Sequence, residues 1–101
     1  HYTPELTSIY APNVNSYRRL AIGSTAPSNL DWGLDNRTTA FRVPNSAAGA
    51  TRIENRFPGA DVNPYLAFAA TLASGYLGMQ HERKPSQPQT GTANENSVQV
   101  A

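Results

Sequence analysis

The residues of this sequence that are best suited to chemistry are its arginines. Seven of its eight basic residues are Arg, and four of these lie from Arg37 to Arg56. Arginine is favoured over lysine where a planar donor must bind a carboxylate or a phosphate through two hydrogen bonds. The pattern indicates a site for an anion, although a set of surface salt bridges is the simpler alternative.

A carboxylate lies among these arginines. Polar and apolar residues alternate from Thr51 to Phe57, so a strand there would place Arg52, Glu54 and Arg56 on one face, about 7 Å apart. One interpretation is an exposed ladder of salt bridges, worth about 0–1 kcal/mol. The other is a site in which Glu54 binds a divalent cation and the guanidinium groups neutralise phosphoryl or carboxylate oxygens. The spacing alone leaves both open.

Further arginines flank this segment. Arg37 and Arg42 are five residues apart, which places them on opposite faces of a regular strand unless a bulge redirects one of them. Arg18 and Arg19 are adjacent in a polar stretch, where one of the two could reach inward. Burying so many guanidinium groups requires anionic partners, and a ligand with several negative charges would offset that cost.

Length and composition narrow the classes of function. The 101 residues, with a mass of 10.9 kDa, allow at most one small domain. The net charge of +1 argues against a nucleic-acid partner, and the absence of cysteine excludes disulfides and thiolate sites. The longest apolar-rich run, Tyr65 to Met79, is shorter than the roughly 20 residues of a membrane span. We expect a soluble, cytoplasmic protein without a membrane partner.

The helices and strands that must position these side chains can be delimited by Pro, Gly and Asn, which interrupt regular structure. The end of a helix is expected in residues 1–10 and a long loop over residues 13–34. Strands are expected over 37–43 and 51–57, which are rich in Thr, Val, Ile and Phe. Residues 84–101 form a polar, low-complexity tail, interpreted as disordered or as a connector.

A helix over Pro64–Gln80 is the clearest element. Asn63 fits the N-cap, and Pro64 fits the first helical position, where a missing N–H costs nothing. Large apolar residues recur at helical spacing, and small residues fill the remaining surface. Such a helix is suited to close packing on more than one side, which is difficult to achieve within 101 residues.

Four motifs together resemble the catalytic domain of the glutamine synthetase family. The motifs are Asn15-Ser16-Tyr17-Arg18-Arg19-Leu20, Asn36-Arg37 with Arg42-Val43-Pro44, Arg52-Ile53-Glu54 with Arg56 and Pro58, and Asn63-Pro64-Tyr65-Leu66. The resemblance covers roughly residues 3 to 80. It implies ATP-dependent activation of glutamate as γ-glutamyl phosphate, followed by attack of an amine nitrogen. It also implies an α+β fold in which antiparallel strands are backed by a close-packed helix.

The resemblance implies a role for each arginine at a motif position. Arg19 and Arg56 correspond to the arginines that hold glutamate. Arg37 corresponds to the catalytic arginine that serves both ATP and the transferring phosphoryl group, and Arg42 and Arg52 correspond to further ATP-phosphate ligands. Such roles suit phosphoryl transfer, which depends on positioning and on electrostatic stabilisation.

Glu54 corresponds to a ligand of the Mg²⁺ or Mn²⁺ ion that bridges the nucleotide phosphates. One glutamate cannot supply the roughly six oxygen ligands of such an ion, and the family's other metal-binding carboxylates lie upstream of these motifs. We interpret residues 1–83 as the C-terminal portion of a catalytic domain that is inactive alone. Its expected partners are the rest of that domain and the neighbouring subunits of a ring-shaped homo-oligomer.

Two positions depart from the family pattern. Thr25 replaces a glutamate that helps to take the proton from ammonium, and threonine is no general base at neutral pH. Gly49 replaces a lysine of the nucleotide site. The segments 13–19 and 32–37 resemble the γ-glutamylpolyamine synthetase branch, which favours an amine over ammonia. Ammonia remains an open alternative, as does a non-catalytic nucleotide-binding or assembly module on the same scaffold.

Overall fold

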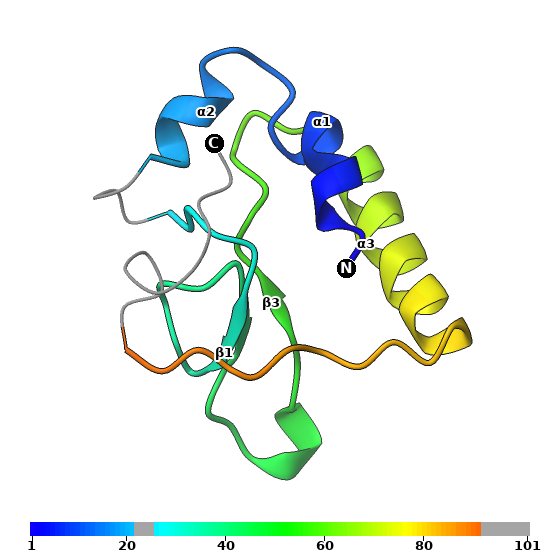
Figure 1. Cartoon of the computed structure of the whole chain (residues 1–101). Helices are drawn as coiled ribbons and strands as arrows, with labels where there is room; N and C mark the ends of the chain where they lie inside the picture. The colour runs from blue at the N-terminus through cyan, green and yellow to red at the C-terminus, as the bar shows by residue number, and fades with distance from the viewer. Residues whose placement is uncertain (22–25, 92–101) are drawn as a thin grey trace.

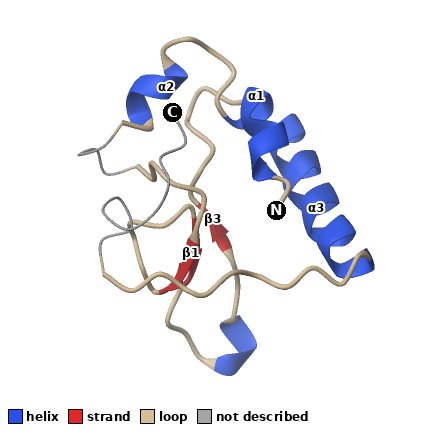
Figure 2. Ribbon diagram, in the orientation of Figure 1, coloured by secondary structure: helices blue, strands red, loops and turns tan. Residues whose placement is uncertain are grey.

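Short helices and short strands precede one long helix in the chain. The computed structural model describes residues 1–21 and 26–91. In chain order the elements are the 3₁₀ helix η1 (Thr3–Leu6), α1 (Thr7–Tyr10), α2 (Ser16–Arg19), β1 (Trp32–Leu34), β2 (Phe41–Val43), the 3₁₀ helix η2 (Ala48–Ala50), β3 (Glu54–Asn55) and α3 (Pro64–Gln80). Figures 1 and 2 show α1 lying against α3, with the strands to one side of this helical pair.

The three strands form one sheet in the order β1-β2-β3. β2 and β3 pair antiparallel, with Arg42 opposite Glu54, whereas β1 runs parallel to β2, with Gly33 opposite Arg42. The α+β class is confirmed, and the expected antiparallel pair is extended by a parallel strand in a region predicted as loop. β1 has only three residues, with a glycine at its centre, so it carries no alternation that sequence analysis could detect.

Both predicted strands are shorter than the sequence indicates. β2 lacks residues 37–40 because Asn36 and two threonines build a turn there: Asn36 Oδ1 accepts from Thr38 N at 3.0 Å, and Thr39 Oγ1 bonds the Asn36 carbonyl at 2.8 Å. Side-chain bonds to the local backbone compete with a strand ladder in this way. β3 lacks residues 51–53, where η2 has just ended and Thr51 Oγ1 is bonded to the Ala48 carbonyl at 3.1 Å. It also lacks residues 56–57, where Asn55 Oδ1 accepts from Phe57 N at 3.2 Å.

The hydrophobic core lies where α1, α3 and the chain after β3 meet. Tyr10 and Phe57 are almost completely buried, and their rings pack edge to face with centroids 6.0 Å apart. The Tyr10 hydroxyl reaches Thr71 Oγ1 on α3 at 2.9 Å, so its polar end is satisfied. Ala67 and Ala70 are the buried residues of α3, which allows the backbone of this helix to approach the core closely.

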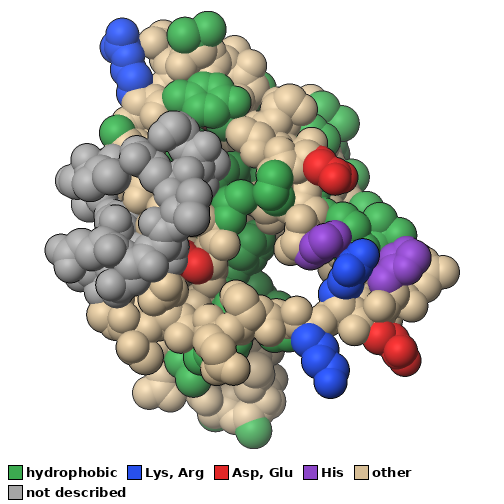
Figure 3. Space-filling view, viewed as in Figure 1, with side chains coloured by type: hydrophobic (Ala, Val, Ile, Leu, Met, Phe, Trp, Pro, Cys, Tyr) green, Lys and Arg blue, Asp and Glu red, His purple; other side chains and the backbone are tan. Residues whose placement is uncertain are grey.

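Helix α3 has the bounds and the N-cap that the sequence predicts. Asn63 Oδ1 accepts from the backbone N–H groups of Tyr65 and Leu66, at 3.0 and 3.3 Å. Most large apolar side chains of α3 remain exposed, among them Phe68 at 69%, Leu72 at 74% and Met79 at 76%, and Figure 3 shows hydrophobic surface over this helix. None of the helices in the described ranges is long and apolar enough to cross a membrane.

The chain after α3 returns to the sheet. Figure 1 shows it, coloured gold to orange, passing close to β1. Gln89 N donates to the Trp32 carbonyl at 2.7 Å, and the Trp32 indole N–H donates to the Ser86 carbonyl at 2.7 Å. Residues 84–91 contain no helix or strand, and residues 92–101 of the predicted tail lie outside the described residues. The boundary at 83/84 stays a prediction.

Candidate active site

Arg42 lies between two carboxylates. The register of β2 against β3 brings it to Glu54, with Nη1 and Oε2 at 2.9 Å, and its Nη2 lies 2.5 Å from Asp35 Oδ1 at the end of β1. The hydrogen bond to Arg42 lowers the pKa of Asp35, and the same bond raises the pKa of Arg42. The Arg42 side chain is only 12% exposed. Its charge is therefore compensated in place.

Glu54 in turn lies between two arginines. Its Oε1 is 3.2 Å from Arg56 Nε, whereas its Oε2 contacts Arg42. Arg56 also donates from Nη1 to the carbonyls of Arg37 and Thr39, the latter at 3.2 Å. Asp35, Arg42, Glu54 and Arg56 thus form a row of alternating charges, called the charged row below.

Arg19 lies at the end of the charged row. Its Nη1 and Nη2 donate to the carbonyls of Phe57 and Arg56, both at 2.6 Å, which fixes α2 against the chain after β3. Burial and the nearby Arg56 lower the pKa of Arg19, and Asp61 acts in the opposite direction. The structure therefore brings Arg19 and Arg56 close to each other. These are the two residues that the sequence predicts to hold glutamate, and that role stays a prediction.

The Asp61 carboxylate links α2 to the segment before α3. Its Oδ2 accepts from Ser16 Oγ at 2.5 Å and from Asn13 Nδ2 at 3.4 Å. The Ser16 bond is the largest cause of the lowered pKa of Asp61. Through Ser16, which begins α2, this contact orients the short helix that carries Arg19.

The structure does not bring Arg52 to Glu54. Arg52 is exposed, and its Nη1 donates to the Ala50 carbonyl at 3.3 Å. The reason is that β3 begins at Glu54, so the alternation assumed for a strand over 51–57 does not extend to Arg52. Arg37 lies in the turn between β1 and β2, with an exposed side chain.

Sequence reasoning missed Asp35, Asn36 and Asp61 as individual residues of the site. Asp35 has a φ of 51°, a left-handed conformation that Asn and Asp tolerate better than most residues. The sequence signal for this turn is therefore the Asp-Asn pair directly before Arg37. Asp61 carries no comparable signal, because its partner Ser16 is 45 residues away in the chain.

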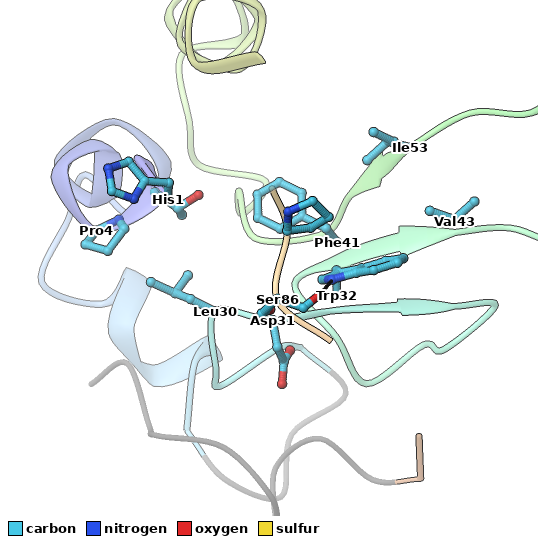
Figure 4. Close-up of a pocket in the computed structure, with 11 residues that line it drawn as sticks. His1, Pro4, Leu30, Asp31, Trp32, Phe41, Val43, Ile53 and Ser86 are labelled. Atoms are coloured by element: carbon cyan, nitrogen blue, oxygen red, sulfur yellow. Dashed lines mark hydrogen bonds between the residues drawn. The ribbon is translucent and has the colours of Figure 1, made fainter. Parts of the chain in front are cut away.

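The two faces of β2 have different chemistry. Arg42 points to the charged row, whereas Phe41 and Val43 point the other way, as strand alternation requires. Together with Trp32 and Ile53 they line an apolar cavity of about 450 Å³, which Figure 4 shows in close-up. A second cavity, of about 600 Å³, lies between the turn that carries Arg37 and residues 88–91.

The described residues do not form a complete metal site. They contain no group of three or more His, Cys, Asp or Glu side chains that could hold a metal ion. Both oxygens of Glu54 already contact guanidinium groups, and one carboxylate is far short of the roughly six ligands of Mg²⁺. The Arg42 Nε, in contrast, is a buried donor with no hydrogen-bond partner in the described part of the chain. Thr25 lies outside the described residues.

Comparison with known proteins identifies the class to which this fold and site belong. A family model described as glutamine synthetase, catalytic domain, matches residues 1–100. The chain therefore belongs to the glutamine synthetase family, and the expected family is confirmed.

Its relatives include ligases for amines as well as glutamine synthetases. It is 50% identical over 97 residues to the glutamate–isopropylamine ligase of a Pseudomonas species, covering 96% of this chain and 21% of that protein. It is 46% identical over 89 residues to a gamma-glutamylethanolamide synthetase of Streptomyces coelicolor (88% and 19%), and 46% identical over 80 residues to the glutamine synthetase of Pyrococcus abyssi (79% and 18%). The chain spans about a fifth of the length of these relatives.

Proposed function

We propose that this chain is the C-terminal part of the catalytic domain of an ATP-dependent ligase that joins glutamate to an amine or to ammonia. The observation that carries the proposal is the placement of Glu54 between Arg42 and Arg56, with Arg19 beside Arg56, in a chain that matches the family's catalytic domain along its length. Clustered guanidinium groups suit a site for nucleotide phosphates and an amino-acid carboxylate, because each can donate two parallel hydrogen bonds to such an anion.

In this proposal the reaction proceeds through γ-glutamyl phosphate. Arg19 and Arg56 hold glutamate, and Arg42 and Arg52 bind ATP phosphates. Arg37, exposed at its turn, serves the transferring phosphoryl group. Fixed cations of this kind stabilise the charge that develops on the transferring oxygens.

Glu54 contributes one ligand to a Mg²⁺ or Mn²⁺ ion whose other ligands lie outside this chain.

The exposed apolar face of α3 also supports the proposal that this chain is one part of a larger catalytic domain. Phe68, Leu72 and Met79 are each more than two-thirds exposed here, a degree unusual for a helix with so many large apolar residues. In the proposed assembly the rest of the catalytic domain covers this face, and neighbouring subunits complete the active site.

The first test is the activity of the full-length ligase against that of the isolated 101 residues. The full-length protein should release phosphate from ATP in the presence of glutamate, Mg²⁺ and an acceptor chosen from isopropylamine, ethanolamine and ammonia. The isolated chain should release none. Turnover by the isolated chain would contradict the fragment interpretation, and nucleotide binding without any turnover by the full-length protein would favour a binding module.

The nature of the acceptor is the second part of the proposal. Thr25 cannot act as a base for ammonium, and the chain is similar to two proteins whose names specify an amine acceptor or product. We therefore expect kcat/KM to be higher with a primary amine than with ammonia. A kcat/KM that is higher with ammonia would remove this part and leave the ligase assignment intact.

A further inference from the structure

The segment after α3 is attached to the turn that carries Arg37. We call residues 86–91 the strap. Besides the two bonds between the strap and Trp32, Asn36 Nδ2 donates to the carbonyls of Gln89 at 3.1 Å and Gly91 at 2.9 Å. All of these contacts use main-chain atoms of the strap. The strap therefore follows β1 and ends directly over the turn.

Asn36 uses both ends of its side-chain amide. While Nδ2 holds the strap, Oδ1 accepts from Thr38 N at 3.0 Å and from Thr38 Oγ1 at 2.7 Å, which closes the turn around Arg37. One side chain thus joins the internal bonds of the turn to the segment that covers it.

The same turn is held from its other side by Arg56. The Arg56 Nη1 donates to the carbonyls of Arg37 and Thr39, on the residues that follow Asn36. The main chain of Arg37 is therefore fixed from two directions, whereas its side chain is exposed. It borders the cavity of about 600 Å³ whose opposite wall is the strap. The turn thus fixes the main chain of a cationic residue that lies at the edge of this cavity.

One position of β1 requires glycine, because both the turn that carries Arg37 and the strap approach it closely. A Cβ added to Gly33 would lie 2.8 Å from Asn36 Cβ and 2.9 Å from the Gln89 carbonyl oxygen, and atoms of this kind do not approach to such distances. Gly33 thus accommodates both the turn and the docked strap.

We propose that Asn36 and the strap position Arg37 for its part in phosphoryl transfer. The inference rests on the proposed function and adds two positioning elements to it, neither of which touches the substrates. Catalysis by electrostatic stabilisation depends on groups held in place before the reaction, and a misplacement of about 1 Å can cost about 100-fold in rate. Releasing the strap should therefore lower kcat and leave the binding of glutamate at Arg19 and Arg56 nearly unchanged.

A pair of variants at one position tests the strap in the full-length ligase. Gln89→Pro removes the N–H that donates to Trp32, whereas Gln89→Ala loses the same side chain and keeps the N–H. Relative to Gln89→Ala, we expect Gln89→Pro to lower kcat by at least about tenfold, with KM for glutamate within about twofold. Hydrogen exchange of the peptide spanning residues 34–41 should become faster in the same variant.

A second variant tests the Asn36 contacts without changing any residue of the strap. Asn36→Asp keeps the acceptor for Thr38 but loses the donor to Gln89 and Gly91. It should reproduce the fall in kcat and the faster exchange if the strap contact matters. It also replaces Gln89→Pro as the test if the proline variant fails to fold.

The outcomes separate this inference from the proposed function. Equal kcat in Gln89→Pro and Gln89→Ala, together with an unchanged kcat in Asn36→Asp, would overturn the positioning role while the unmodified enzyme stays an active ligase. If the unmodified protein has no ligase activity, the proposed function fails, and the exchange rates alone decide whether the strap fixes the turn. Unchanged exchange in both variants would then overturn the inference.

Discussion

At the scale of single residues, the site is organised by alternating charge. Arg42 and Arg56 each contact Glu54, and Arg42 also contacts Asp35, so the two cations and two anions of the charged row neutralise one another. This neutralisation offsets the cost of burying the guanidinium groups. Arg19 lies beside Arg56 and adds a further positive charge at that end of the row.

Arg56→Lys tests the value of a forked donor in this row. The planar guanidinium of Arg56 contacts Glu54 and also bonds the carbonyls of Arg37 and Thr39. The single ammonium group of a lysine cannot reach all three partners at once. We expect a loss of at least about 2 kcal/mol in transition-state stabilisation, measured as kcat/KM of the full-length ligase. Arg18→Lys, on an exposed neighbour of Arg19, is the matched control. Kinetics close to those of the unmodified enzyme would remove Arg56 from the site.

The pKa of Asp61 makes a prediction about acid stability. Its folded-state value is lowered, mainly by the Ser16 hydroxyl, so the stabilisation is complete above the unfolded value of about 4 and is lost as the pH falls through the folded value. Asp61→Asn should lower the free energy of unfolding at pH 7, and the difference from the unmodified protein should shrink towards pH 3. Urea unfolding at both values measures this.

Glu5→Gln is a suitable control for Asp61→Asn, because it also removes one negative charge from an exposed position. A difference for Asp61→Asn that stays constant between pH 7 and pH 3 would show that the Ser16 contact does not depend on the charge of Asp61.

The contacts of Glu54 show how far a site can be predicted from residues alone. The neighbour Arg56 follows from alternation two residues along the chain. The neighbour Arg42 depends on the register of β2 against β3, and the exclusion of Arg52 depends on where β3 begins. Register and strand ends are set by pairing and by turns such as the one around Asn36, which the spacing of charged residues does not encode.

At the scale of elements, α3 and the strands differ in how well sequence predicts them. The bounds of α3 agree with the prediction because local signals fix both its start, Asn63 with Pro64, and its apolar period. The strands of two or three residues are too short to show a period, and β1, with a glycine at its centre, carries no alternation at all. Local capping is therefore a better guide here than strand propensity.

At the scale of the whole molecule, the exposed apolar face of α3 is the feature that the proposed assignment as part of a larger domain explains. Family membership was predicted from four motifs between residues 15 and 66, and the match of the family model over residues 1–100 confirms it. The strap could not be predicted, because it contributes only main-chain atoms to its contacts with Trp32 and Asn36, so its own residue types carry no signal of them.

A glycine of α3 tests whether its open face is covered in the full-length protein. A Cβ at Gly75 would meet nothing within 4 Å in the described part of this chain. Gly75→Ala should therefore stabilise the isolated 101 residues by about 0.5–1 kcal/mol, since alanine favours a helix. In the full-length ligase this gain should vanish or reverse, because the proposed covering surface meets the added methyl group. Thermal unfolding of both proteins gives the comparison, and an equal gain in both would argue against a cover at Gly75.

The main-chain attachment of the strap has a consequence for sequence divergence. A segment recognised through its peptide groups can change its amino acids over generations while its path stays the same, provided that no proline replaces a donating residue. Related proteins would then share the backbone geometry at this edge of β1 without sharing amino acids there, and sequence alignments would score the region as dissimilar. Superposed backbones, rather than aligned sequences, are the means of tracing it from one lineage to the next.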